Sequence, residues 1–129
     1  MARKDELEWA HPLLGFTEEI LRKWLDAVMR NAFRYGYDRF LKKFRWEERV
    51  WILWYVWRDY SGKRWRNFLG ENLKHYRLYR NLAGYELEKI EDELFRYMMR
   101  VVDSIPEGKA ERLAKKVDDY FLSVFWREE

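Results

Sequence analysis

Apolar side chains recur at helical spacing along most of the chain. After a first segment, residues 1–16, Thr17 is followed by Glu18 and Glu19. This combination is typical of a helix start, because the hydroxyl caps backbone N–H groups and the carboxylates favour the positive end of the helix dipole. Apolar residues then recur every three or four positions. The pattern predicts a helix that starts at Thr17 and stops near Gly36.

A second amphipathic segment leads into the most apolar run of the chain. Asp38 is a candidate cap for residues 38–45, which either run straight on or bend at Trp46 into VWILWYVW, residues 50–57. Valine, isoleucine and the aromatic residues favour strands, but the charged flanks and the lack of a partner strand favour a buried helix. A helix that is apolar all round is usually central, so we expect the tryptophans of this run to lie in the core.

Three further helices account for the rest of the sequence. Ser61 can cap the first of them and Gly84 can end it, while Pro106 marks a turn before the last. The three predicted helices cover residues 63–83, 85–102 and 110–124.

The predicted fold is all-α. It is a single compact bundle of about five helices, residues 17–129, with an N-terminal arm, residues 1–16. A chain of 129 residues is long enough for one domain with one core.

The composition is typical of a protein that works at high temperature, and it includes an unusually large number of aromatic residues. Aromatic residues make up 19% of the chain, and each large ring buries roughly 150–250 Å². We therefore expect some rings to face a partner. The chain has no cysteine, which excludes disulfides and thiolate chemistry. It also has no glutamine and 38% charged residues, a composition typical of proteins that work at high temperature.

The N-terminal residues carry charges of both signs and no apolar core of a signal peptide. The apolar run Val50–Trp57 is too short to cross a bilayer, which takes about twenty residues. The sequence therefore predicts a protein that spans no membrane and is not secreted through a signal peptide.

Charge is distributed unevenly along the chain. The net charge is +3, but residues 1–29 carry −2, residues 30–80 carry +9 and residues 81–129 carry −4. A basic centre between acidic ends favours a polyanionic partner.

Most of the basic centre falls on the predicted helix 63–83. On such a helix Lys63, Arg66, Lys74 and Arg77 would form one outward stripe opposite an aromatic face, over roughly 20 Å. Charged helix faces usually alternate in sign, whereas Glu71 is almost the only acid here. The predicted nucleic-acid contacts are Lys63, Arg64, Arg66, Lys74, Arg77, Arg80, Lys42, Lys43 and Arg45.

The sequence offers little for catalysis. Two histidines, three serines and no cysteine form no recognisable nucleophile and base. There is no glycine-rich phosphate loop and no paired histidine spacing for zinc, and Glu71 and His75 are better explained as an ion pair four residues apart. We expect no enzyme activity, no cofactor, no metal and no small-molecule substrate.

A short, cysteine-free, aromatic- and arginine-rich helical chain with the basic segment KRWRNFLGENLKHYRLYR resembles the major capsid proteins of filamentous viruses of hyperthermophilic archaea. The resemblance covers the character of the whole chain. It implies helical subunits that pair and wrap double-stranded DNA in a helical virion. It also implies a location in the virion or the host cytoplasm. The net charge of this chain is lower than expected for a protein that neutralises a genome alone. A second, related and more basic subunit would supply the missing positive charge.

The leading hypothesis is a sequence-independent structural protein that binds the phosphate backbone of double-stranded DNA and assembles with itself. One alternative is a helix-turn-helix regulator in which LGEN, residues 69–72, forms the turn and residues 73–80 read specific sites. Another is a protein–protein adaptor whose basic face meets an acidic protein.

Overall fold

The computed structural model describes residues 17–128, with side chains as far as Val124. The predicted N-terminal arm, residues 1–16, lies outside the described residues. Within them every regular element is helical: α2 Glu18–Phe33, α3 Tyr35–Arg39, η2 Leu41–Lys43, α4 Trp46–Val56, η3 Trp57–Ser61, α5 Trp65–Leu73, α6 Arg77–Arg80, α7 Gly84–Asp103 and α8 Glu107–Glu128. The all-α prediction is confirmed, although the segments are more numerous and shorter than the five expected.

The first helix begins where the sequence predicts. The Thr17 hydroxyl accepts a hydrogen bond from the Ile20 backbone N–H at 3.3 Å. The buried face of α2 carries Leu21, Trp24, Leu25, Val28 and Met29. α2 ends at Phe33, slightly before Gly36, and Asp38 lies inside the short helix α3 instead of capping a helix.

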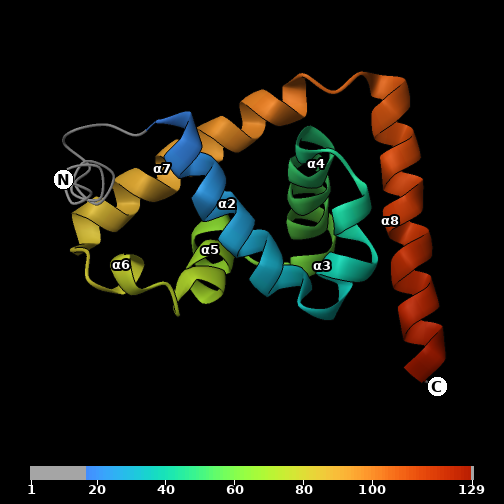
Figure 1. Cartoon of the computed structure of the whole chain (residues 1–129), viewed down its shortest axis with the longest axis horizontal. Coiled ribbons are helices and arrows are strands. Elements are labelled where there is room, and N and C mark those ends of the chain that lie inside the picture. The colour runs from blue at the N-terminus through green and yellow to red at the C-terminus, as the bar shows by residue number, and fades with distance from the viewer. Residues whose placement is uncertain (1–16, 129) are drawn as a thin grey trace.

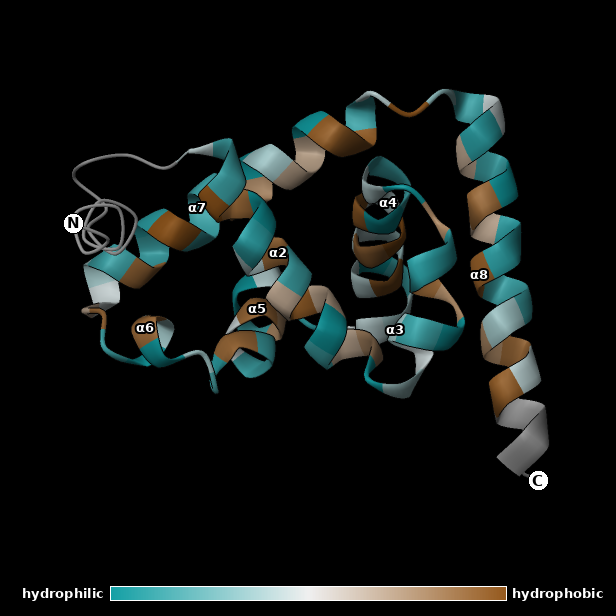
Figure 2. Ribbon diagram, in the orientation of Figure 1, coloured by the Kyte–Doolittle hydropathy of each residue, from teal (hydrophilic) through white to brown (hydrophobic). Residues whose placement is uncertain are grey.

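The apolar run forms the central helix. In α4 the side chains of Val50, Trp51, Ile52, Leu53 and Val56 are buried. Figure 1 shows α4 enclosed between α2, α7 and α8, and in Figure 2 brown and near-white bands of α4 follow a teal first turn. The preceding segment does bend before Trp46, because Phe44 and Arg45 are extended. The prediction of a buried helix is confirmed.

The prediction of one continuous helix over residues 63–83 is wrong. The structure divides it into α5 and the four-residue α6, with an extended backbone at Tyr76. The break lets Tyr76 and Tyr79 pack on Trp24 of α2, with ring centroids 5.2 and 5.7 Å away. Burying two rings against a third outweighs the helical propensity of the segment.

Both predicted ends of that helix are also wrong. The Ser61 hydroxyl donates to the Trp57 carbonyl at the end of the π-helix η3, and α5 starts only at Trp65. Gly84 begins α7 instead of ending a helix, because the Glu86 carboxylate reaches back to the Ala83 backbone N–H at 3.1 Å.

The last helix, α8, docks on the side of α4. Lys109 pairs with Glu48 of α4 at 3.2 Å, and the hydroxyls of Tyr55 and Tyr60 both donate to the Asp118 carboxylate. Phe40 stacks on Tyr120 with ring centroids 4.4 Å apart. Figure 1 shows α8 as the outer wall of the molecule, joined to α7 by a short turn.

Candidate nucleic-acid interface

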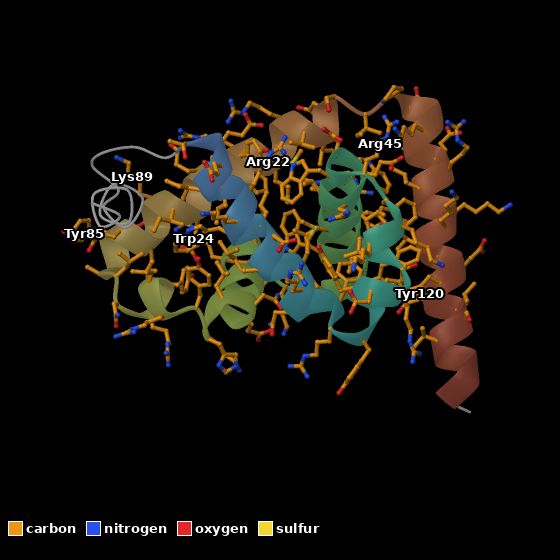
Figure 3. The ribbon with its side chains drawn as sticks, in the orientation of Figure 1. Arg22, Trp24, Arg45, Tyr85, Lys89 and Tyr120 are labelled. Carbon is orange, nitrogen blue, oxygen red and sulfur yellow. The ribbon has the colours of Figure 1, made fainter. Side chains whose placement is uncertain are left out.

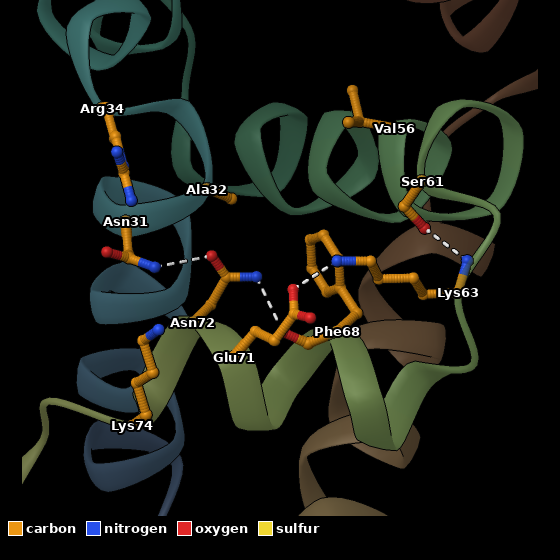
Figure 4. Close-up of a pocket in the computed structure, with 10 residues that line it drawn as sticks. All are labelled: Asn31, Ala32, Arg34, Val56, Ser61, Lys63, Phe68, Glu71, Asn72 and Lys74. Carbon is orange, nitrogen blue, oxygen red and sulfur yellow. Dashed lines mark hydrogen bonds and ion pairs between the residues drawn. The ribbon is translucent and has the colours of Figure 1, made fainter.

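A groove of about 400 Å³ lies where the end of α2 meets η3 and α5 (Figure 4). Its polar lining comes from the end of α2 and, about thirty to forty positions later, from the segment that runs from the end of η3 to just past α5. We call it the basic furrow, and its polar side chains are Asn31, Arg34, Ser61, Lys63, Glu71, Asn72 and Lys74.

Two amide side chains form the floor of the basic furrow. Asn31 of α2 donates a hydrogen bond from Nδ2 to Oδ1 of Asn72 on α5, at 2.7 Å. Asn72 in turn donates from Nδ2 to the Phe68 carbonyl, also at 2.7 Å. The first bond ties α2 to α5, and the second fixes the Asn72 amide on its own helix. Together they leave a neutral, polar floor between the charged side chains (Figure 4).

The charges around this floor do not cancel. Lys63 donates to the Glu71 carboxylate, so that pair is neutral. In the part of the chain that the structure describes, no carboxylate lies within ion-pair distance of Arg34 or Lys74. Their side chains approach Asn31 from opposite sides in Figure 4. The furrow therefore presents two unpaired cations beside hydrogen-bonding amides.

Arg34 has an unusual backbone. Its φ is 39° and its ψ is −103°, and among residues 17–128 no other non-glycine residue has a positive φ. Side chains with a Cβ rarely adopt this region, and such strain is concentrated at functional sites. The Arg34 N–H bonds to the Arg30 carbonyl at 2.9 Å and closes α2.

Sequence reasoning missed Arg34. A single arginine after a helix carries no pattern of its own. Its partners in the furrow lie about thirty to forty positions further along the chain. Only the packing of α2 on α5 reveals the site.

The basic surface continues beyond the furrow. A second groove of about 380 Å³ shares Asn31 and Asn72 with it and extends to His75. Past His75, α6 carries Arg77 and Arg80, both exposed. Neither forms an ion pair with any of the described residues. Of the predicted contacts, Lys63 and Lys74 thus line the furrow, and Arg77 and Arg80 follow on α6.

Arg66 is not a free cation of the predicted basic stripe. Its guanidinium pairs with Glu88 at 3.0 Å and with Asp92 at 2.9 Å, both on α7. These two carboxylates raise the pKa of Arg66. The ion pairs of Arg66 therefore connect α5 to α7. Arg64 lines a different groove, beside Trp57 and Phe95.

The remaining predicted contacts lie at the other end of the central helix. Lys42 and Lys43 belong to η2, and Arg45 immediately precedes α4, whereas Lys63 follows the far end of α4. Eleven helical residues span about 16 Å. Figure 3 labels Arg45 near the start of α4, close to α8. The structure does not bring this cluster to the furrow.

The helix-turn-helix alternative does not fit this segment. The residues predicted to form its turn, 69–72, lie within α5. The helix that would read bases, α6, has four residues, or about 6 Å. A recognition helix needs several side chains along the major groove, and this prediction of a turn is wrong.

Other chemistry is sparse in the part of the chain that the structure describes. No cluster of three or more histidine, aspartate or glutamate side chains is placed to hold a metal ion there. No helix within residues 17–128 has an apolar stretch that would span a lipid bilayer.

No protein-family model matches this chain, and neither a curated protein nor a solved structure matches it. The site must therefore be interpreted from its own residues. Cations without carboxylate partners, next to side-chain amides, suit the oxygens of phosphates.

Proposed function

We propose that this protein binds the phosphate backbone of double-stranded DNA without reading its sequence, and that it packages DNA as a subunit of a helical assembly. One observation carries the proposal: Arg34 and Lys74, from distant parts of the chain, share one groove and have no carboxylate partner among the described residues. A duplex strand presents a continuous row of phosphates that such a surface can neutralise.

The polar lining of the furrow supports backbone contact over base reading. Its floor is a pair of amides whose facing Nδ2 and Oδ1 atoms are already joined, and the adjoining α6 is too short to fill a major groove. Phosphate contacts position a protein on DNA without selecting a sequence. The furrow cations and the two arginines of α6 together supply about four phosphate contacts.

The assembly half of the proposal rests on the exposed surface and on charge. Tyr35 and Tyr85 are 87% and 73% exposed, which is unusual for large rings and leaves them available to neighbouring subunits. The whole-chain character that resembles filamentous-virus capsid proteins agrees with this. A second subunit with more positive charge is part of the same proposal.

The test is fluorescence anisotropy of the full chain with random-sequence duplex DNA across a salt series. We expect the slope of log affinity against log salt to be about −4, since each neutralised phosphate contributes about −0.9. Substituting glutamine at Arg34, Lys74, Arg77 and Arg80 should flatten the slope nearly to zero.

The matched control substitutes glutamine at Lys42, Lys43 and Arg45, which removes nearly the same charge from the other end of α4. This variant should keep most of the slope. Equal loss in both variants would mean that the furrow is not the site. Strong preference for one sequence would favour a regulator, and no affinity for any nucleic acid would favour the adaptor hypothesis.

A further inference from the structure

A further groove, of about 670 Å³, lies between η3, α5 and α7. Its volume falls within the usual range of small-ligand sites. We call it the aromatic groove, and its lining residues are Trp57, Arg64, Trp65, Arg66, Asn67, Asp92 and Phe95. It shares no lining residue with the basic furrow.

Three aromatic rings form the inner corner of this groove. The Trp57 and Trp65 centroids are 5.3 Å apart at 73°, and those of Trp57 and Phe95 are 5.9 Å apart at 86°. Rings inclined so steeply present both faces and edges to the same space. Trp57 and Phe95 remain partly exposed. A flat aromatic ligand can therefore stack on one ring and meet the edges of the others.

Both indoles are fixed in position, and their polar atoms are already used. Trp57 donates from Nε1 to the Lys63 carbonyl at 2.9 Å, and Trp65 donates from Nε1 to the Glu91 carbonyl at 3.3 Å. What they offer a ligand is carbon surface. Such a site recognises a ring by stacking and does not discriminate among ring hydrogen-bonding patterns.

The charges at the mouth of the groove balance overall, but one arginine there has no carboxylate partner among the described residues. Arg66 is held by Glu88 and Asp92, which leaves it neutralised. Arg64 is exposed and has no ion pair within the described part of the chain, and the Asn67 amide lies beside it.

We propose that the aromatic groove binds a nucleotide, with the base among Trp57, Trp65 and Phe95 and the phosphate at Arg64. The proposal stands independently of duplex binding at the basic furrow. An unpaired base of a nucleic-acid strand and a free mononucleotide share this chemistry, namely a flat ring joined to a phosphate.

The test is an NMR titration of the full chain that follows the indole N–H signals of Trp57 and Trp65. The probe is adenosine 5′-monophosphate, compared with adenosine and with inorganic phosphate. We expect the nucleotide to shift both signals in the millimolar range or below, adenosine to bind more weakly, and phosphate alone to leave both signals in place.

Two variants locate the ligand. Arg64→Gln should weaken nucleotide binding about tenfold, the effect of one charged hydrogen bond, without changing the affinity for adenosine. Phe95→Leu keeps apolar volume but removes one ring, and should weaken both ligands roughly fivefold or more. Arg112→Gln, an exposed arginine of α8 outside both grooves, is the matched control and should change neither affinity.

A short single-stranded oligodeoxyadenylate and its duplex identify the source of the nucleotide. Competition by the single strand but not the duplex indicates unpaired bases, and competition by neither indicates a free nucleotide. The proposal is overturned if the nucleotide moves neither indole signal, or if phosphate alone reproduces its shifts. Glutamine at Arg34 and Lys74 should leave nucleotide binding intact, so failure here is distinguishable from failure of duplex binding.

Discussion

At the scale of single residues, Arg34 combines a strained backbone with an unpaired charge. Its positive φ is a conformation that glycine adopts without cost and that other residues rarely adopt. Nothing in the helix end itself requires arginine, since the backbone N–H closes α2 whatever the side chain is. The guanidinium facing the furrow is the feature that glycine would lack.

Substitution of Arg34 by glycine should therefore separate stability from binding. We expect the melting temperature to stay the same or rise, because the strain disappears. The salt slope of duplex binding should become shallower by about 0.9, the contribution of one phosphate contact. Thermal unfolding and anisotropy on the same sample measure both effects. A lower melting temperature with unchanged DNA binding would show that the arginine serves the fold.

Glu91 is a second residue whose environment sets its chemistry. It is 8% exposed, and its carboxylate accepts a hydrogen bond from the Tyr79 hydroxyl at 3.3 Å. Burial raises the pKa of Glu91, and the Tyr79 bond and the Arg66 charge offset only part of this. Burial also raises the pKa of the Tyr79 hydroxyl.

A raised carboxyl pKa makes the folded state bind a proton more tightly than the unfolded chain does. The contribution of Glu91 to stability is therefore most favourable below the ordinary carboxyl pKa and declines as the pH rises through the raised one. Glu91→Gln should remove this decline. The melting temperature of the variant minus that of the parent should therefore increase between about pH 4 and about pH 8. Glu111→Gln, an exposed substitution on α8, is the control. A parallel pH dependence in all three proteins would contradict the assignment.

At the scale of elements, α8 is held to the body where α3 comes closest to it. A Cβ on Gly36 would collide with the Tyr120 hydroxyl and lie 3.2 Å from its Cζ. Tyr120 cannot easily turn away, because its ring stacks on Phe40. Gly36 therefore leaves the space that the Tyr120 hydroxyl occupies.

Gly36→Ala should lower the free energy of unfolding by about 1 to 3 kcal/mol, the usual cost of overpacking. In a Tyr120→Phe background the cost should shrink, since the first atom in collision is gone. Gly108→Ala, whose Cβ would meet nothing within 4 Å in α8, should instead stabilise by up to about 1 kcal/mol. Urea unfolding of the parent, the three single variants and the double variant tests this, and an unchanged cost in the phenylalanine background would rule out the contact.

At the scale of the whole molecule, charge is largely balanced within the fold. Acidic α7 neutralises Arg66, and Glu48 of α4 pairs with Lys109 of α8. The net charge of +3 matches about 5 Å of duplex, since DNA carries one charge per 1.7 Å of its axis. The 22 residues of α8 alone extend about 33 Å.

Duplex DNA coated by this protein should therefore keep a net negative charge until about one subunit is bound per 5 Å of its axis. Gel electrophoresis against protein ratio, with the stoichiometry measured by sedimentation, tests this. If the complex stops migrating at a much lower ratio of protein to DNA, the acidic side chains do not offset the positive charge of the protein in the complex. A more basic second subunit should bring the neutral point to a lower ratio.

The sequence by itself determined the class of the fold and its local signals. Helical spacing and a hydroxyl cap are encoded by neighbours in the chain, so the start of α2 and the burial of α4 followed from Thr17 and from the run Val50–Trp57. The concentration of positive charge between residues 30 and 80 could also be predicted, because the net charge of a segment is the sum over its residues.

Only the tertiary structure decided where the helices break and which cations remain unpaired. The break at Tyr76 depends on Trp24 from another helix, and the loss of Arg66 depends on two carboxylates of α7. Arg34 and Lys74 meet because α2 packs on α5. Contacts between distant residues depend on how faces pack together, and periodicity within one segment contains no information about its partner.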